Sequence, residues 1–140
     1  MRINHSLFSW GRANLLAFTF FAVGLTNVAA QPSDSASQKY PNVVAVKVQP
    51  SGTDTFNFDV TVSSPYDTPQ RYADAIRVIA RDGQVYGERK LLHDHADEQP
   101  FTRDLYEVKI PRGVRMVVVQ ARDQKYGYGG MTVVVTLPGR

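Results

Sequence analysis

The feature that most constrains the fold is a strict alternation of apolar and polar residues near the middle of the chain. Phe56, Phe58, Val60 and Val62 alternate with polar residues over this segment. A β-strand places successive side chains on opposite faces, so the segment has one buried and one solvated face. No stretch after residue 40 follows a helical period convincingly. The ordered part of the chain is therefore predicted to consist of β-strands.

Seven segments carry strand patterns of this kind, separated by turn signals. The pair Asp82-Gly83 is typical of a tight hairpin, and the apolar run 116–119 is typical of a central strand. This count and spacing predict an all-β fold, a single immunoglobulin-like or fibronectin-III-like antiparallel β-sandwich. A seven-stranded barrel is the structural alternative. The predicted strands lie near residues 44–48, 55–62, 72–80, 85–92, 104–110, 115–121 and 131–137.

The N-terminal segment predicts export. Arg2 and Arg12 precede the apolar run 15–25, which ends in small residues at Ala29 and Ala30. A basic start, a short apolar core and a small-x-small end are typical of a secretory signal peptide. The alternative, a retained membrane anchor, needs roughly 20 apolar residues. We therefore expect a signal peptide over 1–30, cleavage near Ala30, and a periplasmic or secreted protein.

The mature chain is predicted to be one small domain without disulfide bonds. Residues 31–40 are polar and Ser-rich, which indicates a flexible leader before a sandwich domain over 41–138. The 140 residues include no Cys, which excludes a disulfide scaffold, a Cys-ligated zinc site, an iron–sulfur cluster and a thiol nucleophile. Removal of the signal peptide takes away Arg2 and Arg12, two of the 16 basic residues. The basic residues that remain nearly balance the 13 acidic residues. That balance gives no reason to expect a nucleic-acid partner.

One short run holds the residues best suited to metal chemistry. His93 and His95 lie two positions apart, so an extended backbone points both imidazoles to one side. Glu98 or Asp97 can complete the site, and nitrogen and oxygen ligands of this kind suit Zn²⁺ or Cu²⁺. The alternative is a solvated turn in which Asp94 and Asp97 bond the local backbone. A candidate metal site at His93, His95 and Glu98 is thus one hypothesis.

Two further segments suggest binding. Arg103 and Glu98 can grip an anionic ligand, or they can pair with each other. Tyr126 and Tyr128 lie in a Gly-rich loop and can present aromatic faces to a sugar or peptide. In the structural alternative the tyrosines pack over the end of the sandwich while the glycines adopt positive φ.

Catalytic motifs are absent from the sequence. Ser63 and Ser64 lack the Gly-x-Ser-x-Gly context of a nucleophile elbow. Carboxylate pairs such as Asp94 and Glu98 are common on protein surfaces. We therefore predict that the protein is not an enzyme, with a hydrolase working from the 93–103 loop as the third hypothesis.

Four motifs together resemble a family of small, uncharacterised exported proteins from Proteobacteria, and the resemblance extends over about 44–137. They are the runs Tyr72-Ala73-Asp74, His93-x-His95-x-x-Glu98-Gln99-Pro100-Phe101-Thr102-Arg103, Ile110-Pro111-x-Gly113 and Gly127-Tyr128-Gly129-Gly130. The resemblance is specific to the family and not to a function.

Departures from the family pattern weaken the metal hypothesis. The family often has His before the Tyr-Ala-Asp run and before the Gly-Tyr-Gly-Gly run, where this chain has Arg71 and Tyr126. If the family site is a four-histidine metal cluster, His93, His95 and Glu98 are a remnant or a weaker site. The resemblance also implies that Asp74 and Arg103, which lie at motif positions, need partners or ligands.

These observations favour an exported binding or interaction module. Its binding residues are predicted to lie on the 93–103 and 123–130 loops, which we expect to share one end of the sandwich. The expected partner is an envelope protein or a small ligand, and the processed chain is expected to be a monomer without a membrane span. The alternative is a Cu- or Zn-binding protein that uses His93, His95 and Glu98.

Overall fold

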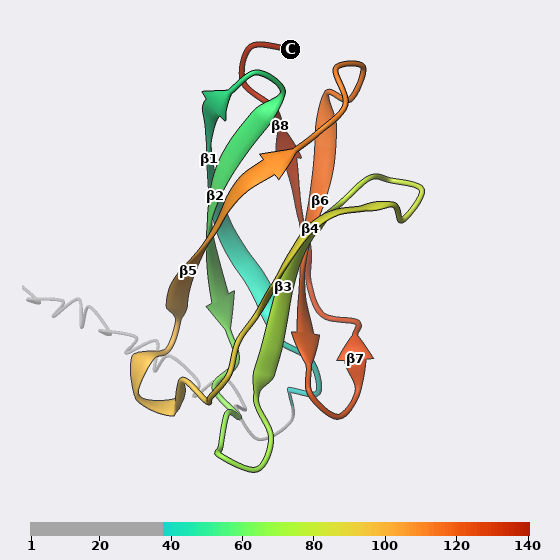
Figure 1. The fold of residues 1–140 in the computed structure, drawn as a ribbon. Helices are drawn as coiled ribbons and strands as arrows, with labels where there is room; N and C mark the ends of the chain where they lie inside the picture. The colour runs from blue at the N-terminus through green and yellow to red at the C-terminus, as the bar shows by residue number, and fades with distance from the viewer. Residues whose placement is uncertain (1–37) are drawn as a thin grey trace, which may run out of the picture. The chain divides into compact units, whose positions relative to one another are not determined.

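The computed structural model describes residues 38–140, so the predicted signal peptide and residues 31–37 of the predicted leader lie outside the described residues. Within 38–140 the regular structure is eight β-strands and one short 3-10 turn (Figure 1). In chain order these elements are β1 (Asn42–Gly52), β2 (Thr55–Ser63), β3 (Ala73–Ile79), β4 (Val85–Lys90), η1 (Ala96–Glu98), β5 (Phe101–Lys109), β6 (Met116–Asp123), β7 (Gly127–Tyr128) and β8 (Val133–Thr136).

The strands form two antiparallel sheets that pack face to face. One sheet has the order β1-β2-β5, and the other has β4-β3-β6, with β7 and β8 both pairing with β6. This is a fibronectin-III-like sandwich, so the predicted fold class is confirmed. The strand that the sequence did not indicate is β7, which has two residues inside the predicted 123–130 loop.

The core lies between the sheets and contains the residues that carried the alternation. Phe58, Val60 and Val62 of β2 are fully buried, and Phe56 is 3% exposed. Their alternating partners on β2 are only partly buried. The opposite sheet contributes apolar side chains in the same way, and all of them pack in one cluster. These are Ala73, Ile76, Val78, Val117, Val119, Ala121 and Val135.

The first strand departs from simple alternation at one position. Val43 pairs with Val62 and Val46 pairs with Val60, and a bulge between Val43 and Ala45 leaves Val44 without a cross-strand partner. A bulge inserts an extra residue and reverses which face the next residues occupy. Val44 is therefore 46% exposed, although the sequence pattern grouped it with Val46 and Val48.

Two strand boundaries also differ from the sequence prediction. β5 begins at Phe101, which pairs with Val62 of β2, so Phe101 and Arg103 belong to a strand and not to a loop. The last strand, β8, is shorter than predicted because Met131 bonds to the other sheet, where its carbonyl accepts the N–H of Val43 at 2.9 Å. Met131 therefore bonds to β1 of the first sheet, and the chain pairs with β6 of the second sheet from Val133 onward.

The hairpin between β3 and β4 follows the prediction. The N–H of Gly83 donates to the carbonyl of Ala80 at 3.0 Å, and Gly83 has φ of 96°. Asp82 accepts the N–H of Gln84 through its side chain at 3.1 Å. Across residues 38–140, no helix has the length and hydropathy needed to cross a membrane.

Candidate functional site

Three loops meet at one end of the sandwich, which we call the loop end. They are residues 64–72 between β2 and β3, residues 91–100 between β4 and β5, and residues 124–130 around β7 (Figure 1). Hydrogen bonds from the first loop reach both others, through Asp67 to His95 and through the carbonyl of Tyr72, which accepts the N–H of Gln124 at 3.0 Å. The two loops singled out from the sequence therefore do lie at the same end. The third loop, which connects them, was missed.

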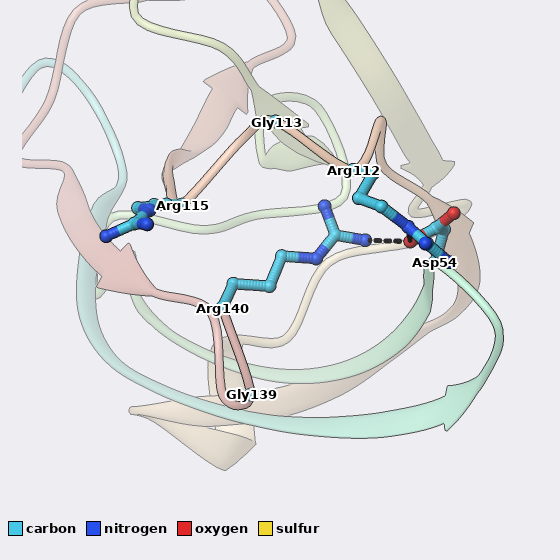
Figure 2. A pocket seen from close by; sticks show the side chains of 6 residues that line it. All are labelled: Asp54, Arg112, Gly113, Arg115, Gly139 and Arg140. Atoms are coloured by element: carbon cyan, nitrogen blue, oxygen red, sulfur yellow. Dashed lines mark hydrogen bonds and ion pairs between the residues drawn. The ribbon is translucent and has the colours of Figure 1, made fainter.

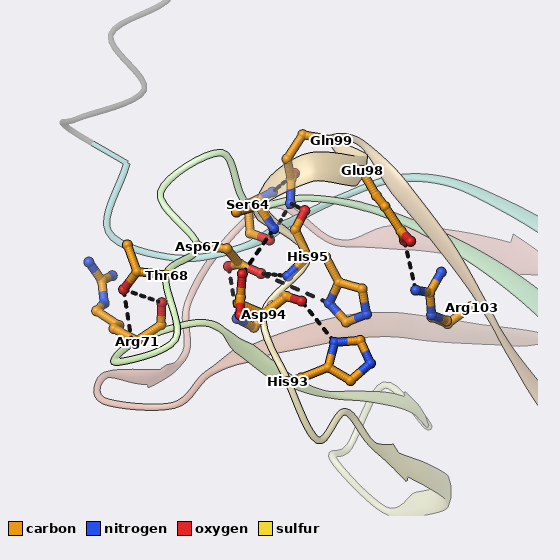
Figure 3. A network of polar contacts seen from close by, with 12 residues as sticks. Ser64, Asp67, Thr68, Arg71, His93, Asp94, His95, Glu98, Gln99 and Arg103 are labelled. Carbon is orange, nitrogen blue, oxygen red and sulfur yellow. Dashed lines mark hydrogen bonds and ion pairs between the residues drawn. The ribbon is translucent and has the colours of Figure 1, made fainter.

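Asp67 joins the first loop to the histidine loop. Its side chain is fully buried, and its two carboxylate oxygens accept the backbone N–H groups of Ala73 and His95, each at 3.0 Å (Figure 3). Burial raises the pKa of Asp67 above its ordinary value, although both hydrogen bonds favour the charged form. A buried carboxylate with two backbone donors holds these loops in one arrangement.

Asp123 has the corresponding role on the other side of the loop end. Arg71 donates to it at 3.0 Å from Nε, and the backbone N–H groups of Lys125 and Tyr126 donate to its Oδ1 at 2.9 and 2.8 Å. Burial alone would favour the neutral form, but the bonds from Tyr126 and Arg71 outweigh it and lower the pKa of Asp123. The turn after β6 is thereby fixed against the 64–72 loop.

The two histidines lie side by side but in different environments. Their ring centroids are 4.7 Å apart (Figure 3), although the backbone at His95 is not in the extended conformation that the sequence argument assumed. His95 is buried and stacks on Phe101 at 4.0 Å between centroids, whereas His93 is exposed and its Nδ1 donates to the carbonyl of Asp94 at 2.8 Å. Burial, together with nearby Arg103 and His93, lowers the pKa of His95.

The carboxylate expected to complete a metal site is engaged elsewhere. Glu98 accepts a hydrogen bond from Nη2 of Arg103 at 2.7 Å, and this bond is the main reason that the pKa of Glu98 is lowered. Nδ1 of His95 lies 4.0 Å from Asp67 and has no hydrogen-bond partner. Within residues 38–140, no three His, Cys, Asp or Glu side chains are grouped so that they could hold one metal ion.

A pocket of about 180 Å³ opens beside the histidines. The cations around it are already paired with carboxylates: Arg103 with Glu98, Arg89 with Asp104, and Lys90 with Glu88. The pocket is therefore close to electrically neutral. It is lined by Arg89, Lys90, Leu91, Leu92, His93, His95 and Arg103.

The two tyrosines of the Gly-rich loop point to different surroundings. Tyr126 is half-exposed at the loop end, where Lys39 and Arg71 each lie 4.8 Å from its ring centroid. Tyr128 instead lies over Arg77 at 3.5 Å and donates from its hydroxyl to Glu88 at 3.0 Å. Burial and the Glu88 carboxylate raise the pKa of Tyr128 to about 12. Of the two tyrosines, Tyr126 therefore lies among the residues of the loop end.

Asp74, selected from the family resemblance, is held by an ion pair. Its Oδ2 accepts from Nη1 of Arg122 at 2.6 Å, and its Oδ1 is buried without a hydrogen-bond partner. Asp74 therefore has the partner that its charge requires, and this partner is Arg122 from β6.

Ser64 and Gln99 complete the internal bonding of the loop end. Gln99 accepts the N–H of Ser64 at 2.7 Å and donates to the carbonyl of His95 at 3.0 Å. Ser64 is fully buried, and its hydroxyl accepts from Gln99 at 3.3 Å. Here Ser64 is a structural contact between two loops.

Sequence reasoning missed Asp67, Arg71, Gln99 and Asp123, although these residues organise the site. Each is a polar residue next to a turn signal, and Asp123 follows a strand whose inward positions are apolar. The sequence contains no sign that their partners come from distant loops. Only the pairing of β3 with β6 brings Arg71 close to Asp123.

The chain is similar in sequence to a haloarchaeal protein. A protein of the haloarchaeon Halomicrobium mukohataei, named "Putative lipoprotein", is 40% identical over 94 residues, which are 67% of this chain and 46% of that protein. The chain thus spans about half the length of this relative. No family model matches the chain, and no solved structure matches it. The relative is archaeal, so the resemblance to proteobacterial proteins stays a prediction.

Proposed function

We propose that the protein is an exported binding module of the cell envelope that contacts a partner protein or small ligand through its loop end. The export half of the proposal is supported by the basic, apolar and small-residue pattern of 1–30 and by the name of the haloarchaeal relative.

The binding half rests on one observation, which is that buried carboxylates tie three separate loops into a single surface. Asp67 and Asp123 make these bonds. Loops held in place before binding lose less conformational entropy when a partner docks. On this surface Leu92 is 83% exposed and lines the pocket beside His93. A partner that covers Leu92 would remove this apolar surface from water, which favours association.

Export is tested by expressing the full chain in a Gram-negative host and measuring the intact mass of the product in the periplasm. The expected product begins at Gln31, because cleavage follows Ala30. An Ala30→Lys variant should accumulate unprocessed, since the peptidase requires a small residue there. Full-length protein confined to the cytoplasm would contradict the export proposal.

Binding is tested by placing a photo-crosslinking residue at Leu92 or at Tyr126 in the exported protein. We expect the same crosslinked product from both positions and none from Gln84, which lies in the hairpin at the opposite end of the sandwich. A small ligand would instead appear in native mass spectrometry as an added mass that disappears on denaturation. Equal crosslinking from Gln84, or no product and no added mass, would contradict a binding role for the loop end.

A second candidate is transition-metal binding, which is favoured by the 4.7 Å separation of the His93 and His95 rings. Two imidazoles and water would form a weaker Cu²⁺ or Zn²⁺ site than three protein ligands. Calorimetry with each metal on the wild type and on a His93→Ala, His95→Ala variant tests it. Micromolar binding that the double variant loses would support this function. Weak binding that is unchanged in the variant would exclude it.

A further inference from the structure

The end of the sandwich opposite the loop end carries a hollow lined mainly by arginines. Its volume is about 530 Å³, and three chain segments form its walls: the β1–β2 turn, the β5–β6 turn and the residues after β8. Figure 2 shows Arg115 on one side of the hollow, Arg112 and Asp54 on the other, and Arg140 between them. Gly113 and Gly139 complete the lining.

Arg140 is a structural part of this hollow. Its side chain is 9% exposed, and Nη2 donates to Asp54 at 2.7 Å and to the carbonyl of Ile110 at 3.0 Å. Nη1 donates to the carbonyls of Val114 and Pro111. With both terminal nitrogens bonded to the protein, this guanidinium is a fixed positive charge beneath the opening.

Basic side chains outnumber acidic ones in the lining of the hollow. Asp54 is the one acidic side chain there, and it is shared between Arg140 and Arg112, whose Nε lies 3.6 Å away. Arg115 takes part in none of the ion pairs found in the part of the chain that the structure describes. Among the side chains of the lining, three guanidinium groups therefore face a single acidic group. This differs from the pocket at the loop end, where each cation has an acidic partner.

A second hollow adjoins the first and is more apolar. It has a volume of about 450 Å³, shares Gly113 and Arg115 with the first, and is also lined by Tyr86, Val114 and Met116. A ligand with an anionic group in the arginine hollow can therefore place an apolar or aromatic group against these side chains.

We propose that these adjoining hollows bind an organic phosphate monoester. Its phosphate would lie between Arg112 and Arg115, above the fixed charge of Arg140. A phosphate monoester carries a charge of about −1.5 to −2 at neutral pH, which is opposite in sign to the guanidinium groups that predominate in the lining. Guanidinium groups also match phosphate oxygens with paired hydrogen bonds. Arg112 is 82% exposed, so its side chain is free to turn toward such a ligand.

The test measures binding of phenyl phosphate, inorganic phosphate and phenol by the protein purified from a host that expresses the full chain. Phenyl phosphate is expected to bind more tightly than inorganic phosphate, and phenol not at all. An Arg112→Gln, Arg115→Gln variant should bind phenyl phosphate at least ~10-fold more weakly, since both charged donors are lost. A Lys47→Gln variant loses a positive charge on β1, outside the hollow, and should bind as the wild type does.

A lipid headgroup can also supply a phosphate monoester, and binding to vesicles distinguishes a lipid ligand from a free one. Vesicles of phosphatidylcholine with and without phosphatidic acid are compared under the same conditions. Binding to phosphatidic acid that requires Arg112 and Arg115, without binding of phenyl phosphate, would assign a lipid ligand. Equal weakening in the Lys47→Gln variant would overturn the proposal. So would a folded wild-type protein that binds neither phenyl phosphate nor phosphatidic acid.

Discussion

At the scale of single residues, His95 shows how burial changes a side chain that looks like a ligand. It stacks on Phe101 and is screened from water, so the fold favours its neutral form and its pKa lies below the ordinary value. The stabilising effect is fully present above the unfolded pKa of about 6.5 and is lost as the pH falls through the lowered folded value. Acidic conditions therefore oppose the folded state at this position.

We predict that the melting temperature falls between pH 7.5 and pH 5, and that His95→Gln reduces this fall. Glutamine cannot take up the proton that destabilises the folded protein. Thermal melting at several pH values measures the effect, and His93→Gln is the matched control because His93 is exposed. If both variants retain the full pH dependence, another group is responsible.

Gly130 is a residue whose role is to leave space. A Cβ built on it would lie 1.9 Å from the carbonyl oxygen of Pro41, which belongs to the backbone and cannot move aside easily. The sequence interpretation assigned positive φ to the glycines of this loop, and that holds for Gly127 with φ of 79°. Gly130 is required instead for close approach of two chain segments.

We therefore predict that Gly130→Ala destabilises the protein by more than ~2 kcal/mol, a value typical of overpacked sites. Denaturant unfolding gives this quantity directly. Gly113→Ala is the control, because a Cβ at Gly113 meets nothing within 4 Å. Similar stability of the two variants would contradict the close approach.

At the scale of elements, the turn between β6 and β7 depends on a single carboxylate. Asp123 holds the N–H groups of Lys125 and Tyr126 and pairs with Arg71 from another loop. Because its pKa is lowered in the folded state, its contribution is present above the unfolded value of about 3.9. It is lost as the pH falls through the lower folded value.

Asp123→Asn is predicted to cost about 2 kcal/mol at pH 7, because the charged hydrogen bond with Arg71 is lost while a neutral acceptor remains. The loss relative to the wild type should shrink as the pH approaches 3. Urea unfolding at pH 7 and pH 3 measures both values. A loss that is independent of pH would show that the charge of Asp123 does not matter.

At the scale of the whole molecule, stability depends on one core without disulfides. Phe58 is fully buried at the centre of β2 and belongs to the cluster shared by both sheets. The chain has no Cys, so no covalent link limits the unfolded state. Loss of core packing must therefore affect the entire sandwich.

Phe58→Ala is predicted to lower the free energy of unfolding by about 3–5 kcal/mol, with one cooperative transition retained. Denaturant unfolding followed by both circular dichroism and tyrosine fluorescence checks this. Val44→Ala is a useful comparison, because the bulge leaves Val44 half-exposed and its truncation should cost little. Separate transitions for the two probes would argue against a single core.

The whole molecule also separates two surfaces by charge. Cations at the loop end are paired with Glu98, Asp104 and Glu88. At the other end, Arg112, Arg115 and Arg140 line a hollow whose one acidic side chain is Asp54. Gln38 lies at the loop end, where its side chain donates to the carbonyl of Ser63, and Arg140 lies at the opposite end (Figure 1).

The sequence alone determined the strand pattern, the sandwich and most of the core. Alternation on β2 depends only on neighbours along the chain, because the pleat of a strand repeats every two residues. Features of this kind are encoded within a few consecutive residues, so they can be predicted from the sequence.

Tertiary structure decided which side chains meet. The sequence left open whether Arg103 pairs with Glu98 or with a ligand, and only the structure shows the pair that removes Glu98 from His93 and His95. Nothing near Asp67 in the sequence shows that it joins two loops. The bulge at Val44 and the arginine hollow around Arg140 likewise depend on strands that are distant in sequence. Burial, ion pairing and pKa depend on three-dimensional neighbours, and only the packed sheets supply them.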